Sequence, residues 1–350
     1  MARVVVLGAG VAGHTAALHL RRKLGKEHEV VVVTPNSRWN WIPSNIWVGV
    51  GKMRPEAVTF PLEPIYRRKG IVLRQAKAVA LRPHGDEADA RGAVDIEYTG
   101  PNEVGRTERL RYDYLVNATG PRLRFDLTPG LGPEHNSVSV CTASHATEAS
   151  AALDAAIAKM SAGERATLVV GMGHGACTCE GAAFEYVFNV DHVLRERGVR
   201  DRARLIYLTN EHELGDFGVG GMRFGSGKGE ITSEAWMTSL FDERGIEVVD
   251  QAHVTEVLPG AVAFDRIDGT SGRIDFDFAM LLPPFRGAAL PVFDRDGSDI
   301  TESVMAPNGF MKGDADYSTK PYEEWSAKDW PSTYESPALP NVFAAGIAFA

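Results

Sequence analysis

The sequence predicts an α/β protein of two similar units, with the second inserted into the first. In each unit a short apolar run leads into a glycine-rich turn and then a helix-like stretch. The runs are residues 3–7 and 167–170, and the turns are Gly8-Ala9-Gly10-Val11-Ala12-Gly13 and Gly171-Met172-Gly173-His174-Gly175-Ala176. Such short apolar runs are typical of strands buried on both faces of a parallel sheet. We therefore predict two Rossmann-like dinucleotide-binding domains, each with a small antiparallel β-meander.

The first glycine turn has the strand before it and the helix after it that a nucleotide-binding turn requires. Glycines at these positions let the backbone approach a pyrophosphate, and the helix N-terminus offers its free amides to the anion. We expect Gly8, Gly10 and Gly13 to bind a dinucleotide here. The alternative is a glycine-rich turn without a ligand, and the strand-to-helix setting argues against it.

The end of the second predicted strand departs from the usual pattern. An acidic residue commonly stands there and binds the ribose hydroxyls, but this chain has Thr34-Pro35-Asn36. Thr34 and Asn36 can still hydrogen-bond a ribose, with less charge assistance.

The second unit repeats the first beyond its glycine turn. A helix-like stretch extends to about residue 197, a strand follows at 205–208, and Glu211 stands near the ribose-binding position. Residues 68–72 resemble 243–247, and 112–114 resemble 276–278. We expect a first domain at 1–120, a second, NAD-like domain with a degenerate cofactor site at 121–283, and a return to the first domain at 284–350, where 341–346 form a last buried strand.

Composition excludes several classes of protein. The net charge of −9 over 350 residues argues against nucleic-acid binding, which needs a basic face. No apolar run reaches the roughly 18 residues of a membrane span, and the N-terminus has no signal-peptide pattern. Three cysteines are too few and too poorly spaced for a disulfide framework or a zinc site, so we expect no metal.

Two of the three cysteines, Cys177 and Cys179, directly follow the second glycine turn. A helix N-terminus there would stabilise a thiolate and lower its pKa. A pyridine nucleotide would compete for the same amides, so we predict that this domain has lost NAD binding and gained sulfur chemistry. We expect one cysteine to face the cofactor and the other to be auxiliary. The alternative is that both simply pack the turn against the sheet.

Candidate proton-handling residues lie near these thiols in the sequence. His145 and His174 are the nearest histidines, and a histidine beside a thiol can act as a base. Glu185 falls about two helical turns beyond Cys177, within an otherwise apolar stretch. The pattern leaves open whether it is a buried functional acid or faces solvent.

Several segments resemble the sulfide:quinone oxidoreductase family over essentially the whole chain. The most specific are Pro43-Ser44-Asn45-Ile46-Trp47, Cys141-Thr142-Ala143-Ser144-His145-Ala146, and residues 175–186 with Cys179 and Phe184-Glu185-Tyr186. Ala118-Thr119-Gly120 and Ala344-Ala345-Gly346 resemble two further FAD segments. Ala76-Lys77-Ala78-Val79 resembles the strand that meets the adenine.

The resemblance implies an FAD enzyme that oxidises sulfide to polysulfide and passes electrons through cysteine and FAD to a membrane quinone. It implies that Cys179 is the flavin-proximal cysteine and Cys141 an accessory one, with Cys177 an extra thiol. It ties Glu185 and His145 to proton handling. The FAD contacts that it implies, beyond the glycine turn, include Pro43, Ala78, Thr119, Gly120 and Gly346.

Two departures from the family change these expectations. Gly215-Asp216-Phe217-Gly218 stands where members often have a histidine. The chain also stops at Ala350, whereas members continue with a third redox cysteine, the quinone pocket and amphipathic helices. We expect a truncated chain, or a variant in which Cys177 or Cys141 is the bridge partner of Cys179. The family implies peripheral association with a prokaryotic inner membrane through that absent region, and allows a homo-oligomer.

Three other functions remain open. A type II NADH:quinone oxidoreductase shares the two-domain plan, and Glu211 fits it, whereas Cys177 and Cys179 do not. A flavin-linked sulfide dehydrogenase that reduces a c-type cytochrome would need export. The third is a non-enzymatic FAD-binding or partner-binding protein.

Overall fold

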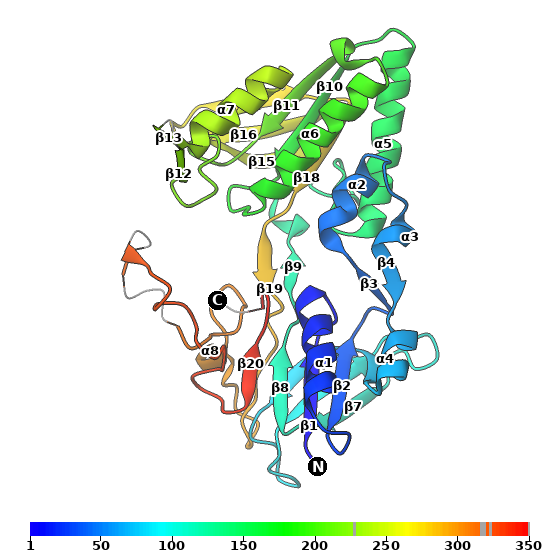
Figure 1. The fold of residues 1–350 in the computed structure, drawn as a ribbon, viewed down its shortest axis with the longest axis vertical. Coiled ribbons are helices and arrows are strands. Elements are labelled where there is room, and N and C mark those ends of the chain that lie inside the picture. Colours follow the sequence, from blue (N-terminus) through cyan, green and yellow to red (C-terminus); the bar gives the residue numbers. More distant parts are fainter. Residues whose placement is uncertain (227–228, 316–319, 322–323, 349–350) are drawn as a thin grey trace. The chain divides into compact units, whose positions relative to one another are not determined.

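In the computed structural model, which describes residues 1–226, 229–315, 320–321 and 324–348, the chain folds into two compact units (Figure 1). The first unit contains Met1–Trp39, Phe60–Arg122 and Arg286–Ala350, and the second contains Asn40–Thr59 and Leu123–Phe285. Residues 40–59, which the sequence assigned to the first domain, therefore belong with the second unit. At the crossings, β3 (Arg38–Asn40) pairs with β4 (Thr59–Pro61), and β9 (Pro121–Leu123) with β19 (Phe285–Gly287).

A seven-stranded sheet forms the first unit, in the order β20-β8-β1-β2-β5-β6-β7. The first five strands in that order are parallel, and β6 and β7 add an antiparallel meander. The strands are β1 (Arg3–Leu7), β2 (Glu29–Thr34), β5 (Val72–Arg82), β6 (Ala93–Tyr98), β7 (Thr107–Arg111), β8 (Tyr114–Asn117) and β20 (Val342–Ala344). The helices are α1 (Val11–Lys23), α4 (Glu63–Lys69) and α8 (Thr301–Val304).

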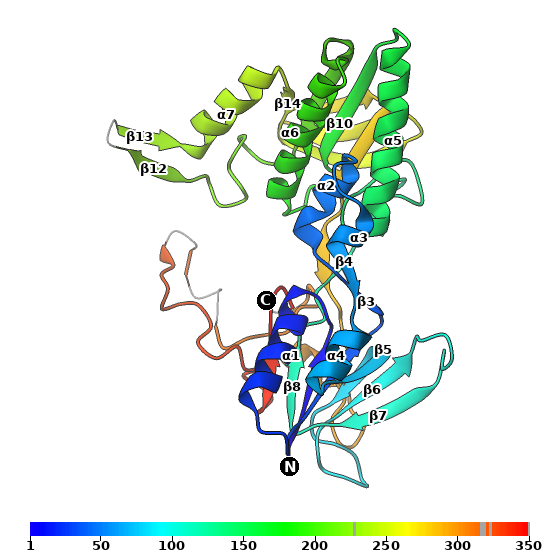
Figure 2. The ribbon, with the colours of Figure 1, turned by 45° about the vertical axis from the view of Figure 1, so that its right-hand side comes forward.

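The alternation of side chains along β1 and β2 supplies both faces of this sheet with apolar contacts. Val6, Val30 and Val32 pack with α1 and α4, which lie on one side of the sheet in Figure 2. Val5 and Val31 point the other way, into a cluster formed by the meander and by the C-terminal segment that returns from the second unit. Both faces are thus covered, which explains why the strands are continuous apolar runs.

The second unit has a four-stranded parallel sheet in the order β14-β11-β10-β18. An antiparallel meander and a hairpin accompany it. The strands are β10 (Ala166–Met172), β11 (Ala203–Leu208), β12 (Arg223–Ser226), β13 (Gly229–Thr232), β14 (Glu247–Val249), β15 (Ala252–Leu258), β16 (Ala261–Arg266), β17 (Ser271–Asp275) and β18 (Phe278–Leu282). The helices are α2 (Asn45–Gly49), α3 (Pro55–Val58), α5 (Ala143–Ser161), α6 (Glu180–Glu196) and α7 (Ser233–Arg244), with 3-10 turns η1 (Ile42–Ser44), η2 (Phe125–Leu127) and η3 (Arg200–Arg202).

One face of this second sheet packs against helices and the other against the meander. Leu168, Val170 and Tyr207 contact the cluster that includes α2, α5, α6 and α7. Val169 and Ile206 point into the cluster formed with β15–β17. The predicted fold class, two Rossmann-like units with a meander each and the second inserted in the first, is confirmed.

The internal repeat seen in the sequence has a structural basis. Gly70 and Gly245 each end a helix in the left-handed conformation, with φ of 70° and 60°. The amide after each glycine bonds back to a carbonyl near the end of its helix, so both helices stop at the same kind of glycine cap before a strand. Asp113 and Asp277 likewise each accept a hydrogen bond from a backbone amide of the neighbouring strand, that of Arg3 in β1 and that of Thr167 in β10.

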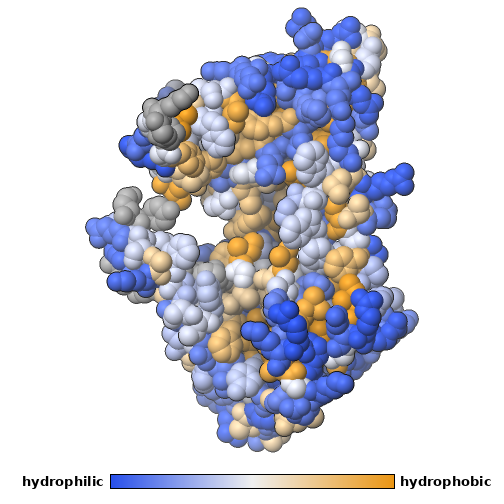
Figure 3. Space-filling model, viewed as in Figure 1, coloured by the Kyte–Doolittle hydropathy of each residue, from blue (hydrophilic) through white to orange (hydrophobic). Residues whose placement is uncertain are grey.

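Apolar side chains are also exposed on the second unit. They include Phe224, Ile231 and Trp236, on β12, β13 and α7, where Figure 3 shows hydrophobic residues beside hydrophilic ones. Within the described ranges, no helix combines the length and hydrophobicity that crossing a membrane would demand.

Candidate functional site

The first glycine turn is packed so tightly that two of its glycines cannot carry a side chain. Gly8 has a φ of 93°, and a Cβ there would lie 2.1 Å from the carbonyl oxygen of Ala118. A Cβ on Gly13 would lie 2.2 Å from the oxygen of Gly8. These contacts bring the start of α1 against the ends of β1 and β8, so the glycines are required by the backbone geometry itself.

The N-terminus of α1 is open on its outer side. Its N-cap is Gly10, no side chain caps it, and the first turn holds no acidic residue. A Cβ on Gly10 would meet no protein atom within 4 Å, and Val11 is exposed. Uncapped amides with the positive end of a helix dipole make a site suited to an anion. The residues present therefore fit the pyrophosphate of a dinucleotide such as FAD.

Two other predicted FAD segments lie beside this turn. A Cβ on Gly346 would lie 2.7 Å from the Cβ of Ala12, so the C-terminal segment contacts the first turn of α1. The amide of Ala345 donates to the oxygen of Asn117, 2.8 Å away. The hydroxyl of Thr119 donates to the side chain of the same Asn117, also at 2.8 Å. These segments thus meet at the carboxyl ends of β1, β8 and β20.

Gly120 follows with a φ of 67° and open space where a Cβ would project. It continues the same edge of the sheet, directly after Thr119. A nucleotide placed on the α1 amides would therefore meet a backbone without side chains on this side.

The remaining predicted FAD contacts are less uniform. Thr34 is buried, and its hydroxyl oxygen lies 3.4 Å from the amide of Asn36, which donates to it. The side chain of Asn36 is exposed and is free to meet a ribose. Ala78 lies on β5 beyond Gln75, the last residue paired with β2. Pro43 lies in η1 of the second unit and is exposed.

The second glycine turn does not lead directly into a helix, which corrects the sequence interpretation. We expected Cys177 and Cys179 to start the helix, but α6 begins at Glu180 with Cys179 as its N-cap. Residues 173–179 form an irregular loop instead. The side-chain amide of Asn210 holds this loop by donating to the oxygens of Gly175 and Cys177, at 2.9 and 3.2 Å. The start of α6 thus lies away from the glycines of the turn.

Glu211, at the ribose-binding position of this unit, is turned inward and only 4% exposed. Its carboxylate accepts hydrogen bonds from the hydroxyl of Thr209 at 2.8 Å and from the amide of Phe217 at 3.0 Å. Burial raises its pKa. A carboxylate occupied in this way fastens the loop after β11 and is not presented to a nucleotide.

All three cysteines are free thiols in the second unit. Cys177 is 3% exposed, and its thiol donates to the oxygen of Leu282 at 3.0 Å. Cys141 and Cys179 are half-buried, and Cys141 is one of the groups whose charge acts on Cys179.

The expectation of a lowered thiol pKa is wrong. Burial raises the pKa of Cys177 and of Cys179 to about 12, and that of Cys141 to about 11. Only Cys179 lies at the helix end, as its N-cap. Even there, the loss of solvent around a thiolate outweighs the favourable effect of the helix end on the pKa. In this state the thiols are therefore protonated.

The other predicted proton-handling residues are dispersed. The ring of His145 packs edge-on against Phe125, with centroids 5.8 Å apart, and burial lowers its pKa. His174 accepts a hydrogen bond from the amide of Ala176. Glu185 is exposed, so of the two positions that the sequence left open it takes the solvent-facing one.

Sequence reasoning missed a buried acid next to the thiols. Glu180, the first residue of α6, is only 7% exposed, and burial raises its pKa. The signal was present in the sequence, because a glutamate directly after Cys179 precedes the apolar run Ala182-Ala183-Phe184. Without the true helix start, nothing distinguished it from Glu185.

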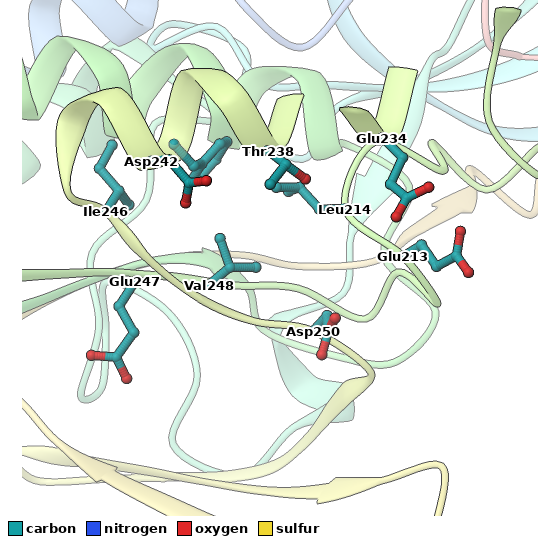
Figure 4. Close-up of a pocket in the computed structure, with 10 residues that line it drawn as sticks. Glu213, Leu214, Glu234, Thr238, Asp242, Ile246, Glu247, Val248 and Asp250 are labelled. Carbon is teal, nitrogen blue, oxygen red and sulfur yellow. The ribbon is translucent and has the colours of Figure 1, made fainter. Parts of the chain in front are cut away.

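Two open hollows lie elsewhere on the second unit. One, of about 400 Å³, lies between α7 and β14 (Figure 4) and is lined by five carboxylates, Glu213, Glu234, Asp242, Glu247 and Asp250. The other, of about 590 Å³, includes Trp47, Phe188 and Glu185. Among the described residues, neither hollow contains a cysteine, so neither is built around the thiols.

The first unit has an open glycine turn suited to a dinucleotide, and the second unit carries the three thiols. These features are those of a nucleotide-dependent oxidoreductase, and sequence comparison agrees. Residues 2–206 match the pyridine nucleotide-disulphide oxidoreductase family, and the chain belongs to that family. The sequence is 29% identical over 284 residues to the sulfide-quinone reductase of Aquifex aeolicus (strain VF5), covering 81% of this chain and 59% of that protein. The resemblance to sulfide:quinone oxidoreductases is thus confirmed, and the family implies a flavin cofactor.

The solved structures agree at the level of the fold. The sulfide:quinone oxidoreductase from Aquifex aeolicus superposes with a TM-score of 0.77 at 25% identity, over 100% of this chain and 69% of that one. NDH2 from Plasmodium falciparum, in complex with NADH, gives a TM-score of 0.69 at 11% identity, over 99% of this chain and 64% of that one. The second likeness shows the shared fold alone, so the choice between these activities depends on the site.

Proposed function

We propose that this protein is an FAD-dependent sulfide:quinone oxidoreductase, which oxidises sulfide to polysulfide. The chain spans 59% of the length of the Aquifex aeolicus protein that it resembles, so the activity of the whole enzyme is inferred for it. Quinone as acceptor implies peripheral association with a membrane, and we place the protein at a prokaryotic inner membrane.

One observation carries the proposal, the altered second glycine turn. In the first unit the helix starts directly after the second glycine of the motif, at Val11, whereas in the second unit it starts seven residues after Gly173, at Glu180. Without that helix end, the turn lacks the amides that bind a pyrophosphate, and Glu211 is engaged internally. Cys177 and Cys179 stand in the intervening loop, which favours sulfide over NADH as the electron donor.

The chain would hold FAD through Gly8, Gly10 and Gly13, with Thr119, Gly120 and Gly346 beside them. Asn36 would face the ribose, while Thr34 supports it from within, and Ala78 and Pro43 would complete the contacts. When bound, FAD would supply two-electron chemistry by taking electrons from a thiolate and passing them to quinone.

The sulfur step is assigned to Cys179 and Cys141. Cys177 is the weaker partner, because it is buried and its thiol already bonds Leu282. In the oxidised enzyme, hydrosulfide would attack Cys141 in a Cys141–Cys179 disulfide. That S–S bond breaks, a new one forms between sulfide and Cys141, and Cys179 leaves as a thiolate with the electron pair. A second hydrosulfide would release the sulfur as polysulfide.

The test is an anaerobic titration of the purified flavoprotein, first with sulfide and separately with NADH, following the flavin absorbance. We expect bleaching by sulfide in the native protein and in Cys177→Ser, and its loss in Cys179→Ser. Bleaching by NADH alone would contradict the proposal and favour the NADH dehydrogenase. A flavin that neither donor reduces would favour the non-enzymatic alternative, and cytochrome c in place of quinone as oxidant tests the sulfide dehydrogenase.

A further inference from the structure

The carboxylate of Glu180 has an unusual setting for a charged group. It belongs to the first residue of α6, directly after Cys179, and is 7% exposed. Among the residues that the structure describes, no lysine or arginine pairs with it, and only its own backbone amide acts to lower its pKa. A buried carboxylate without a cation is strongly disfavoured unless it can take up a proton.

The groups around Glu180 are acidic or neutral. Glu211 and Asp216 from the loop after β11 and Tyr207 from β11 interact with it electrostatically. The two thiols of the preceding loop do so as well, because the charge of Glu180 contributes to the raised pKa of both Cys177 and Cys179. Ionising a thiol here would therefore place a second negative charge beside the first.

Glu211 is the less suitable of the two buried acids to exchange a proton. Its oxygens already accept hydrogen bonds from Thr209 and Phe217, which stabilise the ionised form and fasten the loop. Glu185, on the same helix, is exposed and does not share the buried surroundings of the thiols. Glu180 alone combines burial, absence of a counter-charge in the described structure and adjacency to Cys179.

We propose that Glu180 is the proton partner of Cys179. When Cys179 ionises, its S–H bond breaks and an O–H bond forms on the Glu180 carboxylate, so the pair keeps a single negative charge throughout. Moving one proton within the pair avoids two adjacent buried anions, which is the state that the low-dielectric surroundings disfavour most. This role rests on the proposed function, in which Cys179 acts as a thiolate. Glu180 acts through Cys179, by holding the proton that the thiol releases.

The test measures alkylation of Cys179 by iodoacetamide between pH 6 and 10, read by peptide mass spectrometry on the full chain with its flavin. An isolated thiol reacts tenfold faster for each pH unit below its pKa, since only the thiolate reacts. A thiol that shares one proton with a carboxylate reacts at a nearly constant rate over a stretch above the carboxyl pKa. The width of that stretch, in pH units, equals the amount by which the charge on one group raises the pKa of the other.

We expect the flattened stretch in the native protein and in Glu213→Gln, which removes an exposed carboxylate from the neighbouring loop. We expect Glu180→Gln to restore the tenfold dependence and to slow flavin reduction by sulfide at least tenfold, on the order of a lost proton-transfer group. Glu180→Asp, which keeps the carboxylate, should retain a flattened stretch and serves if the glutamine variant does not fold.

Identical tenfold profiles in the native protein and in Glu180→Gln would overturn the proposal. The same holds if Glu180→Gln reduces its flavin as fast as the native protein. Failure of sulfide to bleach the native flavin would instead refute the proposed function, and the alkylation profile would still decide the role of Glu180.

Discussion

Two glycines of the first turn should respond to alanine in opposite ways. Gly8→Ala places a Cβ 2.1 Å from the oxygen of Ala118 at a φ of 93°, so the clash is inside the protein. Gly10→Ala places a Cβ in open space at a φ of −69°, which alanine adopts readily. The first change should therefore damage the fold, and the second should damage mainly what binds there.

The magnitudes follow from these contacts. For Gly8→Ala, the unfavourable φ costs about 1–2 kcal/mol and the forced separation of packed backbone about 1–3 kcal/mol. At about 2–4 °C per kcal/mol, this sum lowers the melting temperature by about 4–20 °C. Gly10→Ala should lower the stability of the apoprotein by only about 0.5–1 kcal/mol, because alanine is a poorer N-cap residue than glycine. The added methyl group would hold a phosphate away from one or two amides, whose hydrogen bonds contribute about 1.5 kcal/mol each. The affinity for FAD should therefore fall about 10- to 100-fold.

The assay is thermal unfolding of both apoproteins, followed by FAD titration monitored through the flavin fluorescence. Native-like FAD affinity in Gly10→Ala would show that the amides of α1 do not bind the pyrophosphate. An unchanged melting temperature in Gly8→Ala would refute the close approach of the turn to β8.

Three further predictions concern stability. Burial lowers the pKa of His14, which lies beside the Tyr66 hydroxyl, so the unfolded chain binds a proton that the folded chain excludes. The free energy of unfolding should therefore fall as the pH drops below about 6.5. Urea unfolding at pH 7 and at pH 5 should show a smaller fall in His14→Gln than in the native protein. Tyr186→Phe removes a buried 2.9 Å hydrogen bond to the oxygen of Gly49 and should lower the free energy of unfolding by about 1–3 kcal/mol. A loss below about 0.5 kcal/mol would contradict the view that this carbonyl is left buried without its partner. Cys177→Ala removes a packed sulfur atom and its hydrogen bond to Leu282, and it should cost about 1–2 kcal/mol without changing the visible flavin spectrum. Altered flavin absorbance would contradict its structural role.

Much of the fold could be predicted because local patterns report it directly. Continuous valines in residues 4–6 and 30–33 require a sheet covered on both faces, and the structure covers them on both. The likeness of residues 68–72 to 243–247 reflects a shared helix end at Gly70 and Gly245, since a left-handed cap favours glycine whatever surrounds it. The glycines at 8, 10 and 13 belong to the same class of local signal.

The candidate site was less predictable, because its properties depend on burial. The sequence placed Cys177 and Cys179 after the second glycine turn, but an irregular loop bonded to the side chain of Asn210 follows that turn, and α6 begins only at Glu180. Asn210 is more than thirty residues away along the chain, and no local pattern can report such a contact.

The sequence by itself determined the two-unit α/β architecture, the nucleotide turn and the presence of thiols in the second unit. Only the tertiary structure decided that the thiols are protonated, that Glu185 faces solvent and that Glu180 is buried beside Cys179. The physical reason is that a strand or a glycine cap is specified by neighbouring residues, whereas the charge state of a side chain is set by the solvent that distant segments remove from it.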